Sequence, residues 1–368
     1  MDVGRVSRLG RAALPIVAIL VFVGFVGATI AAAGDTLGFD FLAYHQAAVR
    51  LLHGEPLYDM RFETTGAFGL FYYPPTFAPF IVPFGLLSAT TAVYSWIAVL
   101  VVAFAVGVAL LPVSRTVRWW IVLLAGLSWP FAYAIKLGQV GPILFLLFAV
   151  GWRWLDEPIR LGASVALGTA IKLQPGIIFV WAFLTRRFAA VVVGAIMLGV
   201  IAVVATFVAG AGDLWAGLSA WSDFATLVRQ VGDPITTVHN FTPGAIAHQL
   251  GVPADVASVI QLASTVLVLG AVVVAARMAT AEASYLVAVI ASQLLSPVLW
   301  DHYAMLLLLP VAYLCAAGRW WAILIPLATA TPLVAIAPPV VYPACFFVAL
   351  GATLGVGIRA RRLELRAA

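Results

Sequence analysis

Two acidic residues follow the first long apolar segment of the chain and are candidates for a general base. Residues 12–33 are almost entirely apolar, and Asp35 and Asp40 follow directly, ahead of a polar segment that ends near Tyr73. A carboxylate held beside a hydroxyl group can take its proton during a group-transfer reaction. Asp is also a favoured N-cap, so the alternative is that one of the two caps a helix starting near Phe41. Asp35 is more typical of a turn, which leaves Asp40 as the candidate catalytic residue.

The two lysines of the chain, Lys136 and Lys172, both lie in apolar surroundings. A cation inside an apolar segment costs about 2.5–3.5 kcal/mol on insertion scales unless it meets a polar partner. A lipid phosphate would be such a partner, and snorkelling to the membrane interface is the alternative for each lysine. Pro175 adds a kink close to Lys172 that frees a backbone carbonyl, which favours the wall of a cavity.

Polar residues also occur late in the chain. His302, between Asp301 and Tyr303, could donate a hydrogen bond to a phosphate oxygen or orient the acid, or it could belong to an interfacial aromatic belt. His239 and Asn240 could line a sugar site, with a solvated loop as the alternative. The two cysteines lie in apolar segments and no CxxC or HExxH spacing occurs, so neither a disulfide nor a metal site is expected.

Composition decides the class of protein. Hydrophobic residues make up 64% of the chain, charged residues 10%, and the mean hydropathy is +1.09. A soluble protein carries roughly 25% charged residues. We therefore predict an all-α polytopic membrane protein that forms a single membrane domain over residues 1–368. The basic residues are scattered near the ends of apolar segments, which favours membrane lipids rather than nucleic acid as partners.

About twelve apolar segments are expected to cross the membrane as helices, because a spanning backbone has to satisfy its own hydrogen bonds. The second, fifth and tenth are short, so tilted, re-entrant or interfacial helices are the alternatives there. The segments are 12–33, 74–87, 91–112, 119–135, 141–155, 161–184, 189–211, 253–276, 283–299, 303–316, 320–336 and 340–358.

The basic residues at the segment ends predict the orientation. Twelve spans place both termini, Arg186, Arg277 and Arg319 on the cytoplasmic side of a bacterial plasma membrane. Two long loops, 34–73 and 212–252, then lie outside, and we expect the active site there, with amphipathic interfacial helices in the first loop. Four arginines are exceptions, because twelve spans place them on the outer side: Arg115, Arg118, Arg153 and Arg160.

A set of short motifs, taken in order, resembles glycosyltransferase family 87, and the resemblance spans residues 12 to about 304. It implies a C-type glycosyltransferase (GT-C) membrane fold. It also implies transfer of a hexose, mannose in most of the family, from a polyprenyl-phosphate sugar donor to a lipid-linked or glycan acceptor. No cofactor is implied. The motifs are Asp40 to Tyr58, Tyr73-Pro74-Pro75, Gly138-Gln139, Ile171 to Pro175, and Ser296-Pro297 with Trp300 and His302-Tyr303.

The resemblance assigns roles to individual residues. Asp40 matches the position of the catalytic base and His302 that of an active-site histidine. A single displacement would then invert a β-linked donor to an α-linked product. A multi-span lipid or solute carrier or flippase is the alternative, but it would need related halves with broken helices, and no such repeat is visible. The residues assigned to the donor phosphate or the substrates are Lys172, Lys136, Gln139, Tyr44, Tyr73, His239 and Asn240.

Overall fold

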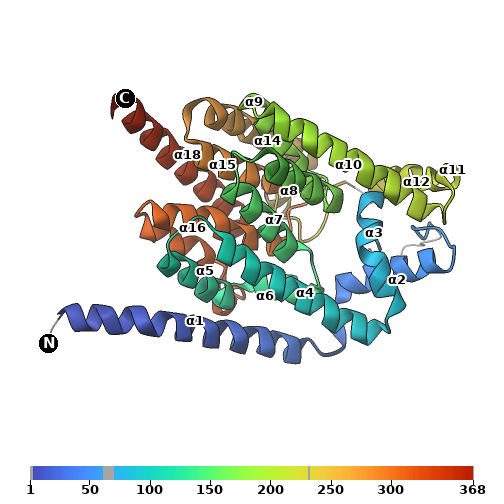
Figure 1. Cartoon of the computed structure of the whole chain (residues 1–368), viewed down its shortest axis with the longest axis horizontal. Coiled ribbons are helices and arrows are strands. Elements are labelled where there is room, and N and C mark those ends of the chain that lie inside the picture. The colour runs from blue at the N-terminus through green and yellow to red at the C-terminus, as the bar shows by residue number, and fades with distance from the viewer. Residues whose placement is uncertain (1–2, 61–69, 231–232, 368) are drawn as a thin grey trace.

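The computed structural model describes residues 3–60, 70–230 and 233–367, and only the backbone of residues 3–12. This part of the chain is helical and contains no strand beyond an isolated bridge between Ser128 and Ala330. Figure 1 shows that most of the longer helices run roughly parallel or antiparallel along one direction of the molecule. The prediction of an all-α protein is therefore confirmed for the described residues.

Five of the described helices are long and apolar enough to cross a membrane, and a sixth span is possible by length if a bent pair counts as one. The pair is α6 (Trp129–Leu137) and α7 (Gly141–Arg153), bent by 117°. These helices confirm a polytopic membrane protein, while the count of twelve and the GT-C fold stay predictions. The five helices are α1 (Val3–Ala33), α4 (Ala89–Leu110), α10 (Phe188–Ala209), α14 (Ala254–Met278) and α18 (Val341–Ala367).

Several of the expected spans are broken into shorter pieces, among them 161–184 and 74–87. The segment 161–184 forms α8 (Pro158–Ile171) and α9 (Ile177–Leu184), because the chain becomes extended at Lys172 and Pro175 follows in the short helix η4 (Gln174–Gly176). The segment 74–87 forms η2 (Pro75–Phe77), α3 (Ala78–Ile81) and η3 (Val82–Leu86). Its prolines recur at every fourth position and remove backbone donors, which explains why no long helix forms.

Three helices near the late motif are almost entirely buried. Helix α15 (Ala281–Leu294) is buried from Ala283 to its end. It is followed by η5 (Asp301–Leu307) and α16 (Leu308–Ala316), which are also almost entirely buried. The remaining helices are α2 (Phe39–Leu52), α5 (Arg115–Leu127), α11 (Leu214–Gly217), α12 (Ser219–Gln230), α13 (Pro243–Gln249), α17 (Leu324–Leu327), η1 (Gly34–Thr36), η6 (Trp320–Ile323) and η7 (Thr331–Leu333).

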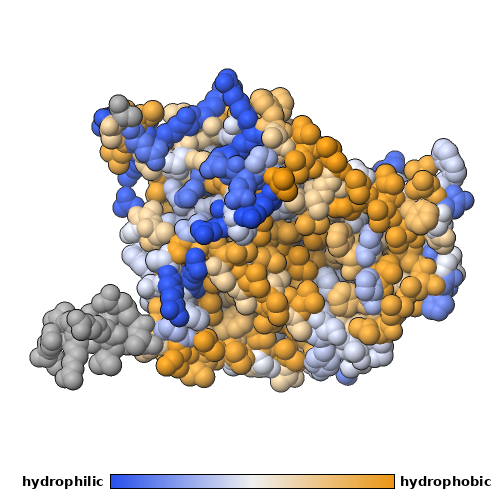
Figure 2. Space-filling model, in the orientation of Figure 1, coloured by the Kyte–Doolittle hydropathy of each residue, from blue (hydrophilic) through white to orange (hydrophobic). Residues whose placement is uncertain are grey.

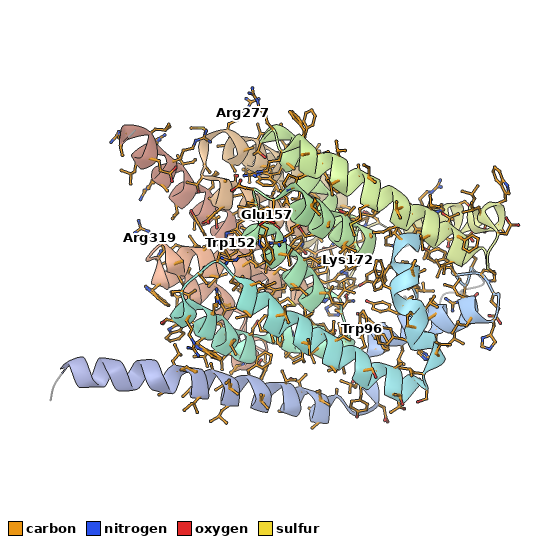
Figure 3. The ribbon with its side chains drawn as sticks, viewed as in Figure 1. Trp96, Trp152, Glu157, Lys172, Arg277 and Arg319 are labelled. Carbon is orange, nitrogen blue, oxygen red and sulfur yellow. The ribbon has the colours of Figure 1, made fainter. Side chains whose placement is uncertain are left out.

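Contacts between distant turns gather most arginines at one end of the bundle. Arg187 Nη1 lies 2.8 Å from Asp156 Oδ1, which joins the turn after α9 to the turn after α7. The rings of Trp120 and Trp320 lie 6.2 Å apart, and an arginine of α18 donates to the carbonyl of Ala279. Figure 1 places the start of α1 and the end of α18 on this side, and Figure 3 places Arg277 and Arg319 there. We call this side the arginine end. The helix ends and turns there carry Arg115, Arg118, Arg153, Arg160, Arg186, Arg187, Arg277, Arg319, Arg359, Arg361, Arg362 and Arg366 in the sequence.

One part of the predicted orientation is wrong for a geometric reason. Segment 74–87 does not traverse the bundle, because the carbonyl of Leu87 at its far end still contacts α2. Segment 161–184 returns to the end from which it starts, because Asp156 before it and Arg187 after it lie 2.8 Å apart. These two differences move the loops between them to the other end of the molecule. The residues that the span count placed on the wrong side are Arg115, Arg118, Arg153 and Arg160.

The surface between the two ends is apolar. Figure 2 shows a broad hydrophobic region across the middle of this face, with hydrophilic residues concentrated toward both ends. Large hydrophobic side chains of α1, α10 and α14, including Leu20, Ile196 and Leu262, are more than half exposed. Such a belt between polar ends fits a bilayer. It leaves α2 and the bends of the broken helices at the end opposite the arginines (Figure 1).

Candidate active site

A glycine turn positions Asp40 at the start of α2. Gly38 is the N-cap residue with a φ of 73°, and its backbone N–H donates to the carbonyl of Lys136 at 2.7 Å. A Cβ atom at this position would lie 2.8 Å from the side chain of Val93, so both conformation and space favour glycine. Asp40 lies in the first helical turn and not at the N-cap. The alternative that Asp40 serves as the N-cap is therefore wrong, and the positive end of the helix dipole faces its carboxylate.

A chain of hydrogen bonds orients the Asp40 carboxylate. Tyr44 Oη donates to Tyr73 Oη at 2.7 Å, and Tyr73 Oη donates to Gln139 Oε1 at 2.8 Å. Because Gln139 Oε1 is the acceptor, its amide N–H group faces Asp40 and donates to Oδ2. The two tyrosines and Gln139 are buried. They act on the carboxylate through one another, and Oδ1 of Asp40 accepts no hydrogen bond from the described residues.

The bend between α6 and α7 brings Gln139 to Asp40. Gly138 ends α6 with a φ of 72°, and Pro142 stands at the start of α7, so the sequence itself stops one helix and begins the next. Trp96 Nε1 donates to the carbonyl of Gly138 at 2.7 Å. A Cβ atom at Gly138 would lie 2.7 Å from Phe41, which shows how closely the bend packs against α2.

Lys172 stands where the chain leaves α8. Its Nζ donates to Tyr303 Oη at 3.0 Å and lies 4.2 Å from the centre of that ring and 5.5 Å from the ring of Tyr73. Gln174 Nε2 donates to Ser296 Oγ at 2.6 Å. No ion pair with a carboxylate is present for Lys172 in the described part of the chain. Figure 3 shows Lys172 toward the same side of the molecule as Trp96. The lysine is thus a cation held by neutral groups and available to an anionic ligand.

His302 is the most unusual buried group. It is 4% exposed, and neither of its ring nitrogens has a hydrogen-bond partner among the residues that the structure describes. Asp301 Oδ1 accepts from the backbone N–H of His302 at 2.8 Å and lies 3.7 Å from Nδ1, while Trp129 Nε1 donates to Asp301 Oδ2 at 3.1 Å. Buried polar atoms are normally paired, so two unpaired nitrogens indicate a site for a ligand.

Electrostatic coupling shows that these groups form one site. Burial raises the pKa of Asp40, and the hydrogen bond from Gln139 and the nearby His302 and Lys172 oppose this rise. Burial lowers the pKa of His302, against the effects of Asp301 and Asp40. Burial also raises the pKa of Tyr73 to about 12, so its hydroxyl stays protonated near neutral pH. Asp40, Lys172 and His302 therefore lie within electrostatic range of one another, although they are far apart in sequence.

The remaining candidates from the sequence are Lys136, His239 and Asn240. The side chain of Lys136 is half-buried and makes no hydrogen bond or ion pair with any described residue. His239 is exposed, with a φ of 62°. Asn240 is fully buried; its amide donates to the carbonyls of Pro234 and Pro297, and its Oδ1 accepts two backbone N–H groups. Asn240 thus ties the second loop to the segment that precedes His302.

Several residues of the site were not among the sequence candidates. Gln174, Ser296 and Tyr303 belong to the motifs that carry the family resemblance, so their presence there was a usable signal. Trp129 and Tyr133 had no such signal. The rings of Tyr133 and His302 are 6.3 Å apart, a contact between positions that nothing in the sequence pairs. In the described part of the chain, no group of three or more His, Cys, Asp or Glu side chains could hold a metal ion.

Comparisons with known proteins agree with the resemblance. The sequence model of glycosyltransferase family 87 matches residues 71–299. A curated protein of Mycobacterium tuberculosis, a polyprenol-phosphate-mannose-dependent alpha-(1-2)-phosphatidylinositol mannoside mannosyltransferase, is 28% identical over 290 residues, which cover 72% of this chain and 67% of the relative. No solved structure matches significantly. The family match includes Tyr73, Gln139 and Lys172, whereas Asp40 precedes it and His302 follows it.

Proposed function

Because the chain belongs to glycosyltransferase family 87, we propose that this enzyme transfers a hexose from a polyprenyl-phosphate sugar to a glycolipid or glycan acceptor, with inversion and with Asp40 as the general base. The relative's name supports mannose as the sugar and a glycolipid as the acceptor. Membership of a glycosyltransferase family decides against the carrier or flippase alternative. The twelve-span GT-C architecture belongs to the same proposal.

The observation that supports the proposal most is that one oxygen of the Asp40 carboxylate accepts a hydrogen bond and the other is left for a substrate. Gln139 donates to Oδ2, and Oδ1 accepts no hydrogen bond from the residues that the structure describes. In the transfer step the acceptor oxygen forms a bond to the anomeric carbon while its proton passes to Asp40. The bond between that carbon and the phosphate oxygen breaks, and the polyprenyl phosphate leaves with the electron pair. A positioned general base contributes about 10²- to 10⁴-fold to such a step.

The departing phosphate needs donors and positive charge. Lys172 supplies the charge and Tyr303 a neighbouring hydroxyl, 3.0 Å from its Nζ. Burial lowers the pKa of His302, so the ring is neutral near neutral pH and presents one N–H donor and one acceptor. Fixed donors in a site with little water are usually the largest contribution to catalysis of this kind.

The position of the arginines supports an outer-face site. Cytoplasmic loops of membrane proteins carry an excess of Lys and Arg. The arginine end then faces the cytoplasm of a bacterial plasma membrane with both chain ends, and the Asp40 site faces outward. Single cysteines at Ser222 and Thr185, in a chain whose Cys315 and Cys345 are replaced by Ala, test this. An impermeant thiol reagent added to intact cells should label Ser222→Cys and not Thr185→Cys; the opposite result overturns the orientation.

Activity is tested with purified protein in proteoliposomes. Radiolabelled polyprenyl-phosphate mannose and a bacterial membrane lipid extract should yield a labelled lipid or glycan, whereas radiolabelled GDP-mannose should not. Nuclear magnetic resonance of the product should show an α-linkage formed from a β-linked donor. The absence of transfer from the lipid donor would refute the proposed donor, and a β-linked product would refute the single displacement.

A further inference from the structure

Asn240 uses all of its hydrogen-bonding capacity within the protein. Its amide N–H groups donate to the carbonyls of Pro234 at 2.8 Å and Pro297 at 3.1 Å. Its Oδ1 accepts from the backbone N–H groups of Thr242 at 3.0 Å and Leu299 at 2.9 Å. An asparagine side chain has two N–H donors and two acceptor positions, so none of the four is left for a substrate. The buried side chain of Asn240 therefore holds backbone rather than a sugar.

The backbone that Asn240 holds is the irregular segment 295–300 between α15 and η5. This segment is neither helix nor strand, and Pro297 within it has no N–H group, so regular backbone bonds do not fix its path. The N–H group of Leu299 donates to Asn240, and the Leu299 carbonyl accepts from the backbone N–H of Phe241 at 2.8 Å. Leu299 is fully buried, and buried backbone groups need such partners. Two adjacent residues of the second loop thus bind both polar groups of Leu299.

The segment leads directly to His302. The backbone N–H of Tyr303 donates to the carbonyl of Trp300 at 3.1 Å, so the first turn of η5 starts one residue after Leu299. Only Trp300 and Asp301 separate Leu299 from His302. A shift of Leu299 therefore moves the His302 ring, whose two nitrogens have no partner among the described residues.

A second contact holds the start of the segment beside Lys172. Gln174, two residues after this lysine, donates from Nε2 to Ser296 Oγ at 2.6 Å. Ser296 Oγ donates in turn to the carbonyl of Val298 at 2.6 Å. The segment is thus held from the break after α8 on one side and by Asn240 on the other. The position of η5 relative to Lys172 depends on both contacts.

We propose that Asn240 is a positioning residue that keeps the His302 ring within reach of a phosphate bound at Lys172. It acts through the backbone of Pro297 and Leu299 and touches neither substrate. This inference rests on the proposed function, because it takes the donor phosphate to bind at Lys172. The alternative is that Asn240 only supports the folded loop, and then its loss would have an effect that is independent of His302.

The test is a double-mutant cycle between Asn240 and His302. Initial rates in proteoliposomes across polyprenyl-phosphate mannose concentrations give kcat and the donor KM. His302→Ala should lower kcat/KM by about 10²-fold, as for the loss of one fixed donor. Asn240→Ala should lower it by about 10-fold, because it displaces the ring without removing it. The double variant should be no worse than His302→Ala, because residues that act as a unit are not additive. A double variant with the product of the two losses would overturn the positioning role.

The stability of each variant is measured on the same preparation. Asn240→Ala leaves buried backbone groups unpaired and should lower the Tm. If it does not fold, Asn240→Ser takes its place in the cycle, because a serine hydroxyl can still accept from one backbone N–H.

Gln261→Met is the matched control. Gln261 Oε1 accepts from the backbone N–H of Gly244 at 3.1 Å, which ties the same loop to α14 and not to the segment before His302. This variant should also lower the Tm, while kcat/KM should stay near the wild-type value. A fall in kcat/KM as large as that of Asn240→Ala would show a general effect of the loop and would overturn the specific role of Asn240.

A binding measurement distinguishes this inference from the proposed function. Native mass spectrometry with undecaprenyl phosphate, which has the phosphate group and no sugar, reports the phosphate site without transfer. Asn240→Ala and His302→Ala should each retain less of this lipid than the wild type, and the double variant should retain as much as His302→Ala. If that pattern holds while no sugar is ever transferred, the positioning role is supported and the proposed function is wrong. If transfer occurs but Asn240→Ala keeps wild-type lipid retention and a wild-type donor KM, the inference is overturned.

Discussion

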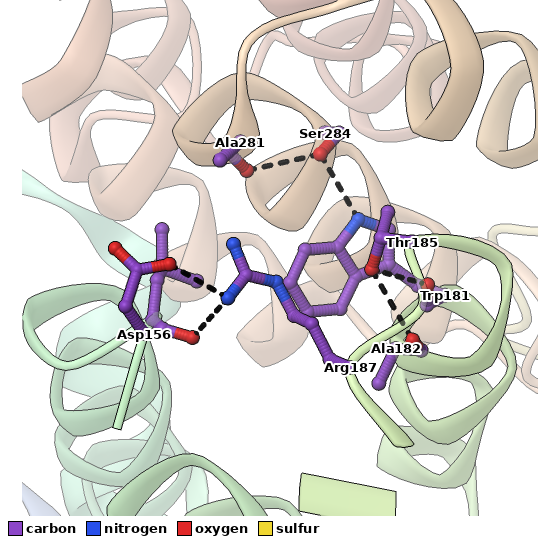
Figure 4. A network of polar contacts seen from close by, with 8 residues as sticks. Asp156, Trp181, Ala182, Thr185, Arg187, Ala281 and Ser284 are labelled. Carbon is purple, nitrogen blue, oxygen red and sulfur yellow. Dashed lines mark hydrogen bonds and ion pairs between the residues drawn. The ribbon is translucent and has the colours of Figure 1, made fainter. Parts of the chain in front are cut away.

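The charged side chains at the two polar ends of the molecule have different kinds of partner. At the arginine end, Arg187 lies 2.8 Å from Asp156 and donates to the carbonyl of Leu155 (Figure 4). The same network includes Trp181 Nε1, which donates to Ser284 Oγ at 3.0 Å. At the site end, Asp40 and Lys172 have neutral hydrogen-bond partners, and no ion pair to either of them is found in the described part of the chain.

The difference shows which charges belong to the fold. The Asp156 side chain is 92% exposed, and exposed ion pairs contribute about 0–1 kcal/mol to stability. A charge that is partly buried without an opposite charge lowers stability instead, so its presence indicates a role with a ligand. Removing a charge at the site end should therefore reduce turnover with little effect on folding. Removing a charge at the arginine end should have only a small effect on turnover and on folding.

The largest expected effect is that of Asp40→Asn. Asparagine has the same shape but cannot take a proton, so turnover should fall by at least about 10²-fold while the donor KM stays near the wild-type value. Initial rates across donor concentrations in proteoliposomes measure both. Asp35 is exposed in η1, and Asp35→Asn is the matched control, which should retain most activity. Near-normal turnover of Asp40→Asn, or an equally inactive Asp35→Asn, would identify the wrong carboxylate.

The sequence predicts the local setting of Asp40 well. The apolar residues at helical spacing after Asp40 predict an amphipathic helix in the first loop. The structure has helix α2 there, with Phe41, Tyr44, Ala48 and Leu51 buried and Leu52 exposed. These features depend on neighbours within a few turns, which a sequence pattern records. The polar character and the apolar surroundings of Lys172 and His302 are also visible in the sequence.

The contacts that assemble the site could not be predicted in the same way. Asp40 and Gln139 are joined by a hydrogen bond across 99 positions, and Lys172 and Tyr303 across 131. Hydropathy also treats segment 161–184 as one span, although Lys172 and Pro175 break it. Together with segment 74–87, which does not traverse the bundle, this error reverses the predicted side of the loops between the two segments. Hydropathy measures the apolar content of a segment and not its path, so a chain that turns back halfway is read as a chain that crosses.

Lys172→Gln should have the next largest effect. It removes the positive charge that we assign to the donor phosphate and keeps a polar side chain. We expect the donor KM to rise by roughly 10- to 100-fold, which corresponds to a charge-assisted hydrogen bond of about 1.5–3 kcal/mol. Tyr303→Phe, which removes the hydroxyl 3.0 Å from Lys172 Nζ, should give a smaller rise. A wild-type donor KM in Lys172→Gln would mean that this lysine is not a phosphate ligand.

Gln139→Met should change the pH dependence rather than the binding of either substrate. The amide of Gln139 favours the charged form of Asp40, and it opposes the rise in pKa that burial causes. Without it the pKa of Asp40 rises further, so a larger fraction of the base is protonated at a given pH. The acidic limb of the pH–rate profile should therefore move to higher pH, and turnover lost at low pH should recover as the pH increases, because a base works when deprotonated. Tyr73→Phe, which removes the hydroxyl bonded to Gln139, should shift the pH–rate profile in the same direction by less. An equal loss of turnover at every pH would indicate a structural role instead.

Asp156→Asn should have the smallest effect, and it tests whether charges at the arginine end contribute to turnover or stability. The substitution removes the charge opposite Arg187 at a position where the carboxylate is almost entirely in solvent. Because the guanidinium group also donates to the backbone of Leu155 and keeps that acceptor, the unfolding free energy should fall by less than about 1 kcal/mol. Thermal unfolding in detergent and initial rates in proteoliposomes measure stability and turnover on the same preparation. A loss of turnover comparable to that of Lys172→Gln would show that the arginine end takes part in catalysis, and the division of roles between the two ends would be wrong.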